Sequence, residues 1–78
     1  MKATDIKAGR KYQGTSGAVR AVLSIEEEAW AGNEHSYLDE NGVYHGKTRK
    51  YVRMQESNGD IYEPLLRSFA RWAVREVE

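Results

Sequence analysis

The pattern of apolar and polar positions is clearest in residues 18–26, "AVRAVLSIE". Four apolar residues recur there at every second position: Val19, Ala21, Leu23 and Ile25. Arg20 and Ser24 fall on the opposite face, and a period of two is typical of a strand with one face on the core. Val22 is also apolar, so we expect the second face to be partly covered. The pattern predicts a strand that points Val19, Leu23 and Ile25 into the core.

Shorter stretches with strand character surround this segment. They are residues 10–13, 37–38, 43–44, 51–54 and 61–62. Between them lie the turns 14–17, 39–42 and 57–60, rich in Gly, Asn, Asp and Ser, which tolerate a positive φ or bond to their own backbone. Residues 27–36, "EEAWAGNEHS", show no period and are expected to form a loop or a broken strand. Whether they are ordered stays open.

The period changes near the C-terminal end of the sequence. On a helix, six apolar residues would share one face: Leu65, Leu66, Phe69, Trp72, Ala73 and Val77. Arg67, Arg71 and Arg75 stand four apart on the other face. We interpret them as the solvated side of the helix rather than as a phosphate site. The helix is predicted to begin either at Pro64, a favoured first position, or after Ser68 as the N-cap.

Several short strands followed by one helix predict a mainly β (α+β) fold in a single domain, residues 1–78. We expect four or five antiparallel strands in a small twisted sheet or partial barrel, with one C-terminal helix. The second half of the chain is expected to add six core residues: Val52, Ile61, Leu66, Phe69, Trp72 and Ala73.

Composition narrows the class of protein. The chain has 78 residues and no cysteine, so neither a disulfide nor a thiolate zinc site supplements a small core. The first residues lack the apolar run of a signal peptide, and no apolar run is longer than three residues. We therefore expect a cytoplasmic protein with no membrane partner.

Positive and negative charges cancel overall but are segregated along the chain. Residues 1–24 carry a net charge of +4, residues 25–42 carry −6, and residues 43–75 carry +4. Either the acidic segment packs near the basic ones and neutralises them, or it forms a surface for a basic partner. The pI of about 6.7 lies below the value of about 9 that is typical of dedicated nucleic-acid domains.

No catalytic constellation is recognisable. His35 and His45, with Asp39 between them, match no metal-site spacing. The loop 14–17 lacks the lysine and the following helix of a phosphate-binding loop. No serine lies in a nucleophile elbow. We expect no enzymatic activity, no cofactor and no metal.

Two binding surfaces remain as alternatives. The first is an acidic surface for a protein partner, formed by Glu26, Glu27, Glu28, Trp30, Glu34, Asp39 and Glu40. Its carboxylates would steer toward a basic partner, and Trp30 would either supply buried area there or fold back onto the core. The second is a nucleic-acid surface on which tyrosines stack on bases. Its cations would be Arg49, Lys50, Arg53, Arg71 and Arg75.

Three pieces of the sequence resemble a loose group of small phage and prophage proteins. They are "DIKAGRKY" at 5–12, "VRAVLSI" at 19–25 and "SFARWA" at 68–73. The first piece also resembles the opening of SH3-like barrels. The segment 27–50 is longer and more acidic than expected of the small phage proteins. The resemblance implies an SH3-like sheet and a phage-like origin. We therefore expect a non-enzymatic protein-binding module that, as a phage protein, engages or inhibits a host protein; a phage structural or assembly component is a further alternative. It implies no catalytic residues.

Overall fold

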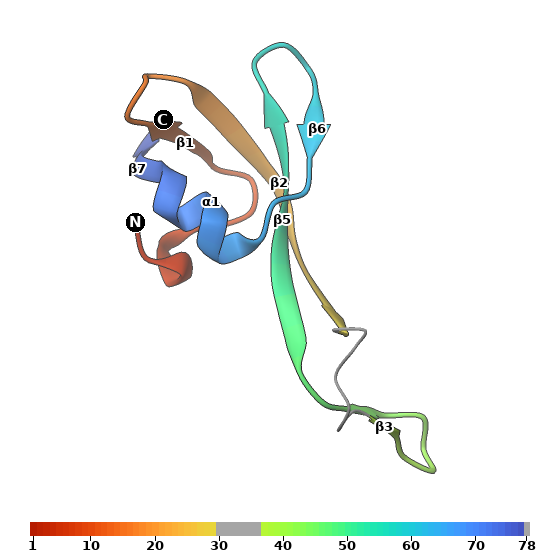
Figure 1. The fold of residues 1–78 in the computed structure, drawn as a ribbon. Helices are drawn as coiled ribbons and strands as arrows, with labels where there is room; N and C mark the ends of the chain where they lie inside the picture. Colours follow the sequence, from red (N-terminus) through yellow and green to blue (C-terminus); the bar gives the residue numbers. More distant parts are fainter. Residues whose placement is uncertain (30–36, 78) are drawn as a thin grey trace.

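The computed structural model describes residues 1–29 and 37–77 as a twisted antiparallel sheet with little helix (Figure 1). The main sheet has five strands in the order β6-β5-β2-β1-β7. Their bounds are β1 (Lys11–Gly14), β2 (Val19–Ala29), β5 (Thr48–Glu56), β6 (Ile61–Tyr62) and β7 (Ala73–Val77). A separate hairpin pairs β3 (Tyr37–Leu38) with β4 (Tyr44–His45). The described helices are η1 (Ala3–Asp5), a 3₁₀ turn, and α1 (Leu66–Trp72).

The predicted mainly β fold is confirmed. In the main sheet, β1 pairs with β2, β2 pairs with β5, and β5 pairs with β6. The β3–β4 hairpin is inserted between β2 and β5 in the chain. The last strand, β7, returns to pair with the first, β1. The helix α1 lies in the chain directly before this last strand. Strands β6 and β7 form the two edges of the described sheet, so it is not closed into a barrel.

The single helix is confirmed, but its predicted extent is wrong at both ends. It begins at Leu66, because the Pro64 carbonyl accepts a hydrogen bond from Val52 N–H and Leu65 bridges to Tyr51, which keeps both residues extended. It ends at Trp72, since residues 73–77 form a strand on β1. The predicted column of three arginines is therefore broken, with Arg75 on a strand.

A bulge in β2 overturns the predicted inward face of that strand. Val22 pairs with Met54 and Ser24 pairs with Arg53, so Leu23 has no partner of its own. One extra residue reverses the alternation beyond it. Val22 is therefore buried, Leu23 is 44% exposed, and Ile25 packs against the core. We call the side of the sheet that carries Val22 and Ile25 the core face.

Other predicted core positions divide between confirmed and wrong. Val52, Phe69 and Ala73 are buried, and Leu66 and Trp72 pack against the buried cluster. Ile61 is exposed because it lies on the short edge strand β6, and Val19 is half-buried outside the cluster. Besides Val22, the predicted core omitted four buried residues: Ile6, Tyr12, Met54 and Ala70.

Tyr12 is fully buried with its hydroxyl satisfied. The hydroxyl oxygen accepts a hydrogen bond from Lys7 N–H at 2.7 Å and donates one to the Asp5 carbonyl at 3.2 Å. Its ring meets the Phe69 ring edge to face, with centroids 5.8 Å apart. Tyr12 thus links the segment before β1 to Phe69 of α1. Its two hydrogen bonds satisfy the hydroxyl, as burial of a polar group requires.

Trp72 closes one end of the core. Its ring packs on Phe69 at 5.4 Å, and the Arg20 guanidinium lies 4.2 Å above it. Arg20 was predicted on the outer face but lies on the core face, where it also pairs with Glu56 at 3.2 Å. Gly14 lies against the edge of the same ring, so close that a Cβ atom there would stand 2.5 Å from it.

We predict that Gly14→Ala destabilises the fold, because the added methyl group overlaps the Trp72 ring. Overpacking of this kind costs about 1–3 kcal/mol. In a domain of this size each kcal/mol lowers Tm by roughly 4–8 °C. Urea and thermal unfolding of Gly14→Ala, Trp72→Leu and the double variant measure the effect. The penalty of Gly14→Ala should shrink in the Trp72→Leu background, and an equal penalty in both would show that the ring is not its cause.

Candidate protein-binding surface

Half of the β2–β5 pair projects beyond the rest of the sheet (Figure 1). β1 pairs only with residues 19–21 of β2, and β6 pairs only with Met54 and Gln55 of β5. Residues 26–29 and 48–51 therefore form a two-stranded ribbon, which we call the arm. The projection gives the molecule principal extents of 47 × 22 × 19 Å.

The arm brings the two rival sets of candidate residues face to face. Glu26, Glu27 and Glu28 of β2 stand opposite Tyr51, Lys50 and Arg49 of β5. The Arg49 guanidinium lies 2.7 Å from the Glu28 carboxylate, and the Glu27 carboxylate accepts a hydrogen bond from the Thr48 hydroxyl. Opposite charges directly across a strand pair attract each other. The acidic segment is thus partly neutralised by its basic neighbours, and the arm is not a surface of a single sign.

The basic candidates do not share one face. Because side chains alternate along a strand, Arg49 and Arg53 lie on the outer face of β5 and Lys50 lies on the core face. Arg71 is exposed on α1, and Arg75 lies on β7, where it donates a hydrogen bond to the Gln13 side chain at 2.7 Å. The structure therefore offers no continuous track of these five cations for a phosphate backbone.

Carboxylates dominate the outer face of the arm around Tyr51. Partial burial raises the pKa of the Tyr51 hydroxyl, and the negative charges of Glu26, Glu28 and Glu63 raise that pKa further. A small hollow of about 170 Å³ lies beside it, lined by Glu28, Arg49, Tyr51, Glu63 and Leu65. These three carboxylates are unfavourable for a polyanion, while Arg53 acts in the opposite direction on the same hydroxyl.

At the far end of the arm, Asp39 organises the turn of the β3–β4 hairpin. One carboxylate oxygen accepts hydrogen bonds from the N–H groups of Asn41 and Val43, each at 2.9 Å. The other oxygen lies 2.9 Å from Nε2 of His45, whose ring stacks on Tyr37 with centroids 4.9 Å apart. The turn is therefore held by side chains rather than left to the strands, which pair over two residues only.

This hairpin exposes three large apolar side chains, which we call the apolar tip. Tyr37 is 60% exposed, Leu38 is 68% exposed and Val43 is 53% exposed. The sequence patterns predicted the hairpin but not this role, because the residues read as ordinary strand positions. The available signal was that a two-residue strand pair is too short to cover its own apolar residues. Asp39 and Glu40, predicted as part of the acidic surface, lie in the turn of the tip.

Two predicted partner-binding residues, Trp30 and Glu34, lie outside the described residues. The question whether Trp30 joins the core therefore falls outside them too, as does His35.

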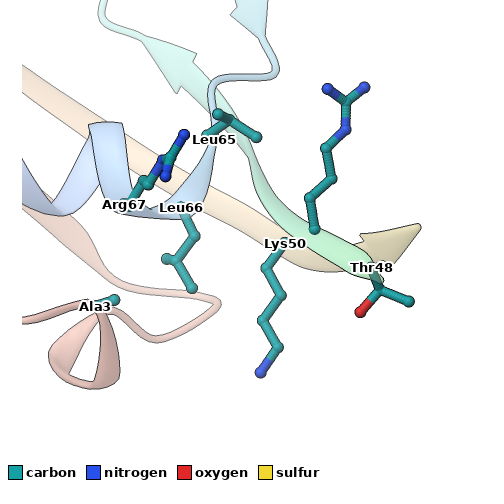
Figure 2. A pocket seen from close by; sticks show the side chains of 7 residues that line it. Ala3, Thr48, Lys50, Leu65, Leu66 and Arg67 are labelled. Atoms are coloured by element: carbon teal, nitrogen blue, oxygen red, sulfur yellow. The ribbon is translucent and has the colours of Figure 1, made fainter. Parts of the chain in front are cut away.

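A basic groove lies between the base of the arm and the start of α1 (Figure 2). It has a volume of about 430 Å³. Its lining residues are Ala3, Thr48, Arg49, Lys50, Leu65, Leu66 and Arg67. In the figure, the Leu66 and Lys50 side chains point to the same side, one from the helix and one from the strand. The groove thus combines three cations with an aliphatic floor, and no carboxylate lines it.

No protein-family model, no curated protein and no solved structure matches this chain. Within residues 1–29 and 37–77, no three His, Asp or Glu side chains come together as metal ligands. The described part of the chain also has no helix long and apolar enough to cross a membrane. The geometry of the arm, the apolar tip and the basic groove is therefore what supports a function.

We predict that His45→Gln raises the pKa of Asp39 toward its ordinary value of 3.8. In the hairpin that pKa is lowered, mainly by the hydrogen bond with His45 and then by those from Val43 and Asn41. Because the folded pKa is the lower one, the Asp39 contribution to the turn is present above pH 3.8 and is lost as the pH falls through the folded pKa.

The pKa is measured by NMR titration of the Asp39 carboxyl carbon in both proteins. Lys47→Gln is the control, because it removes a nearby positive charge without removing a hydrogen bond to Asp39. An Asp39 midpoint that is the same in wild type and His45→Gln contradicts the prediction, and an equal rise in both variants would assign the effect to net charge.

Proposed function

We propose that this protein is a non-enzymatic protein-binding module whose contact surface is the apolar tip at the end of the arm. The observation that carries the proposal is the exposure of Tyr37, Leu38 and Val43 together on one small hairpin, away from the core. A chain of 78 residues has few large apolar side chains for its core, so three left in water at one site favour a use outside the fold.

The geometry of the tip suits binding. Tyrosine and aliphatic side chains at the centre of an interface supply most of its buried apolar area. The Asp39 hydrogen bonds and the His45–Tyr37 stack fix the turn before any partner arrives. A surface that is already ordered loses less conformational entropy on binding. The tip is therefore suited to insertion into an apolar depression of another protein.

Charge around the tip supports a basic partner. Glu40 is exposed in the turn and forms no ion pair with any described residue, whereas Asp39 is engaged by His45. Exposed carboxylates at the rim of an interface raise the rate of encounter more than the affinity. The resemblance to small phage proteins extends the proposal to a host protein as the partner and to the host cytoplasm as the location. The carboxylates of the arm contribute less than the sequence predicted, because Glu28 is paired.

We predict that Leu38→Ser abolishes capture of the partner and that Leu23→Ser does not. Both substitutions remove an exposed leucine, but Leu23 lies at the β2 bulge and Leu38 at the tip. Truncation of a residue at the centre of an interface costs about 2 kcal/mol or more, which is a loss of roughly 30-fold in affinity. Affinity purification with each tagged protein, followed by calorimetry with the purified partner, measures the difference.

Equal loss with Leu23→Ser, or binding unaffected by Leu38→Ser, would remove the tip from the function.

Gel shifts with single- and double-stranded nucleic acid at low salt test the nucleic-acid alternative, which predicts a shift that weakens with Arg53→Glu and Arg71→Glu. Light scattering tests the assembly alternative, which predicts self-association of the purified protein.

A further inference from the structure

The basic groove adjoins a stretch of strand edge that has no neighbour among the described residues. β6 pairs with β5 only at Met54 and Gln55, and Leu65 bridges to β5 only at Tyr51. Beyond Tyr51, residues 48–50 of β5 have β2 on one side and no described strand on the other. Free strand edges of this kind accept an additional extended chain.

The backbone of this edge points its polar groups toward the groove. Val52 N–H faces away from β2, since it donates to the Pro64 carbonyl at 2.8 Å. Alternate residues of an antiparallel strand direct their N–H and C=O groups to the same side. Lys50 and Thr48 therefore direct theirs toward the side where β6 has ended, which is the side of the groove.

Arg49 of the groove is paired with Glu28, and the other two cations form no ion pair with any described residue. None of the ion pairs within the described residues involves Lys50 or Arg67. Lys50 stands across from Glu27, but the Glu27 carboxylate is engaged by Thr48. Lys50 comes from the strand and Arg67 from the helix start, so each wall of the groove carries a positive charge. In Figure 2 the Lys50 and Leu66 side chains point to one side of the groove and the Arg67 side chain points to the other. η1 closes the groove with Ala3 and is held by the Met1 ammonium group, which donates to the Ala70 and Ala73 carbonyls.

From these three features we infer that the basic groove is a second binding site, for an extended peptide that carries an aliphatic residue two positions from one carboxylate and next to another. The peptide backbone adds to the free edge at residues 48–50 by antiparallel or parallel pairing. Because side chains alternate along an extended chain, the aliphatic residue and the carboxylate two positions away share one side, where they contact Leu66 and Lys50. The neighbouring carboxylate points to the other side and binds Arg67. This site goes beyond the apolar tip, from which it is separate in the fold.

A peptide fits these features better than a nucleic acid does. The groove has a free row of backbone donors and acceptors and an aliphatic floor, and its lining contains no aromatic ring on which a base would stack. On the outer face beside it, Glu28 and Glu63 oppose a polyanion. A volume of about 430 Å³ lies within the range of roughly 300–1,000 Å³ that ligand sites occupy.

The test is fluorescence anisotropy with a labelled peptide, Ser-Glu-Asp-Ile-Ser-Glu-Ser, at low salt. A peptide with lysine at the three acidic positions and a short oligodeoxythymidine are compared with it. We expect the acidic peptide to bind and the lysine peptide not to bind. Lys50→Glu with Arg67→Glu should weaken binding at least tenfold. Lys47→Glu with Arg71→Glu is the matched control, because it reverses two exposed charges outside the groove and should change binding less than twofold.

Strand addition is tested on the peptide, where no variant can fail to fold. N-methylation at the residues that face the edge should abolish binding, and N-methylation at the intervening residues should leave it. Circular dichroism confirms that both charge-reversed proteins are folded, and Leu38→Ser should bind the peptide as wild type does. If the wild-type protein binds its partner through the tip but does not bind the peptide, this inference alone is contradicted.

Three outcomes overturn the inference. The first is equal binding of the acidic and lysine peptides, or equal loss in the groove variant and its matched control. The second is binding of the oligodeoxythymidine with the same dependence on Lys50 and Arg67, which would make the groove a phosphate site. The third is an oligomer that the wild-type protein forms, that the groove variant does not form, and that the peptide does not dissociate. This outcome would make the groove a contact between copies of this chain.

Discussion

The rest of the structure depends on the register of β2 against β5, and the bulge at Leu23 sets that register. On one side of the bulge, Arg20 and Val22 face the core; on the other side, Ile25 does. Without the extra residue, every side chain beyond it would change face. Ile25 would leave Val52, and the aliphatic contact that anchors the arm to the core would be lost.

The same register sorts the charges of the arm. It places Glu28 with Arg49 on the outer face, and it places Glu27 with Lys50 and Thr48 on the core face, beside the basic groove. Before the bulge, Arg20 lies on the same core face and over the Trp72 ring, and Gly14 leaves room for the edge of that ring. The one inserted residue thus decides the core and the character of two surfaces.

The sequence predicted the fold class because its strongest signals are local. Turn residues and alternation identified the strands before the helix, and burial of Phe69 followed from helical spacing. Ala73 is buried as predicted, but on the strand β7 rather than on the helix. Leu23, Arg20 and Arg75 were misplaced because a bulge and a helix end are decided by pairing with distant strands. At residues 73–77 the helical spacing was outweighed by pairing with β1, which also suits the β-branched Val74 and Val77.

The candidate sites were less predictable, because charge along a sequence does not show which charges meet. The acidic and basic segments were predicted as rival surfaces, and the structure pairs them across one ribbon. The apolar tip and the basic groove depend on where strands stop: β3 and β4 are too short to cover their own side chains, and β6 ends before it reaches Lys50. Strand ends are set by tertiary packing, and no local pattern marks them reliably.

The free edge of β5 also raises the question of how the protein avoids joining the edges of other copies. Charged residues on an edge strand, lysine above all, oppose pairing between identical edges. Lys50 supplies that repulsion at residues 48–50, because the charge of Arg49 is paired with Glu28. The same lysine attracts a strand of opposite charge. One side chain would thus disfavour self-pairing and favour an acidic partner, which is how a discriminating surface uses repulsion and attraction together.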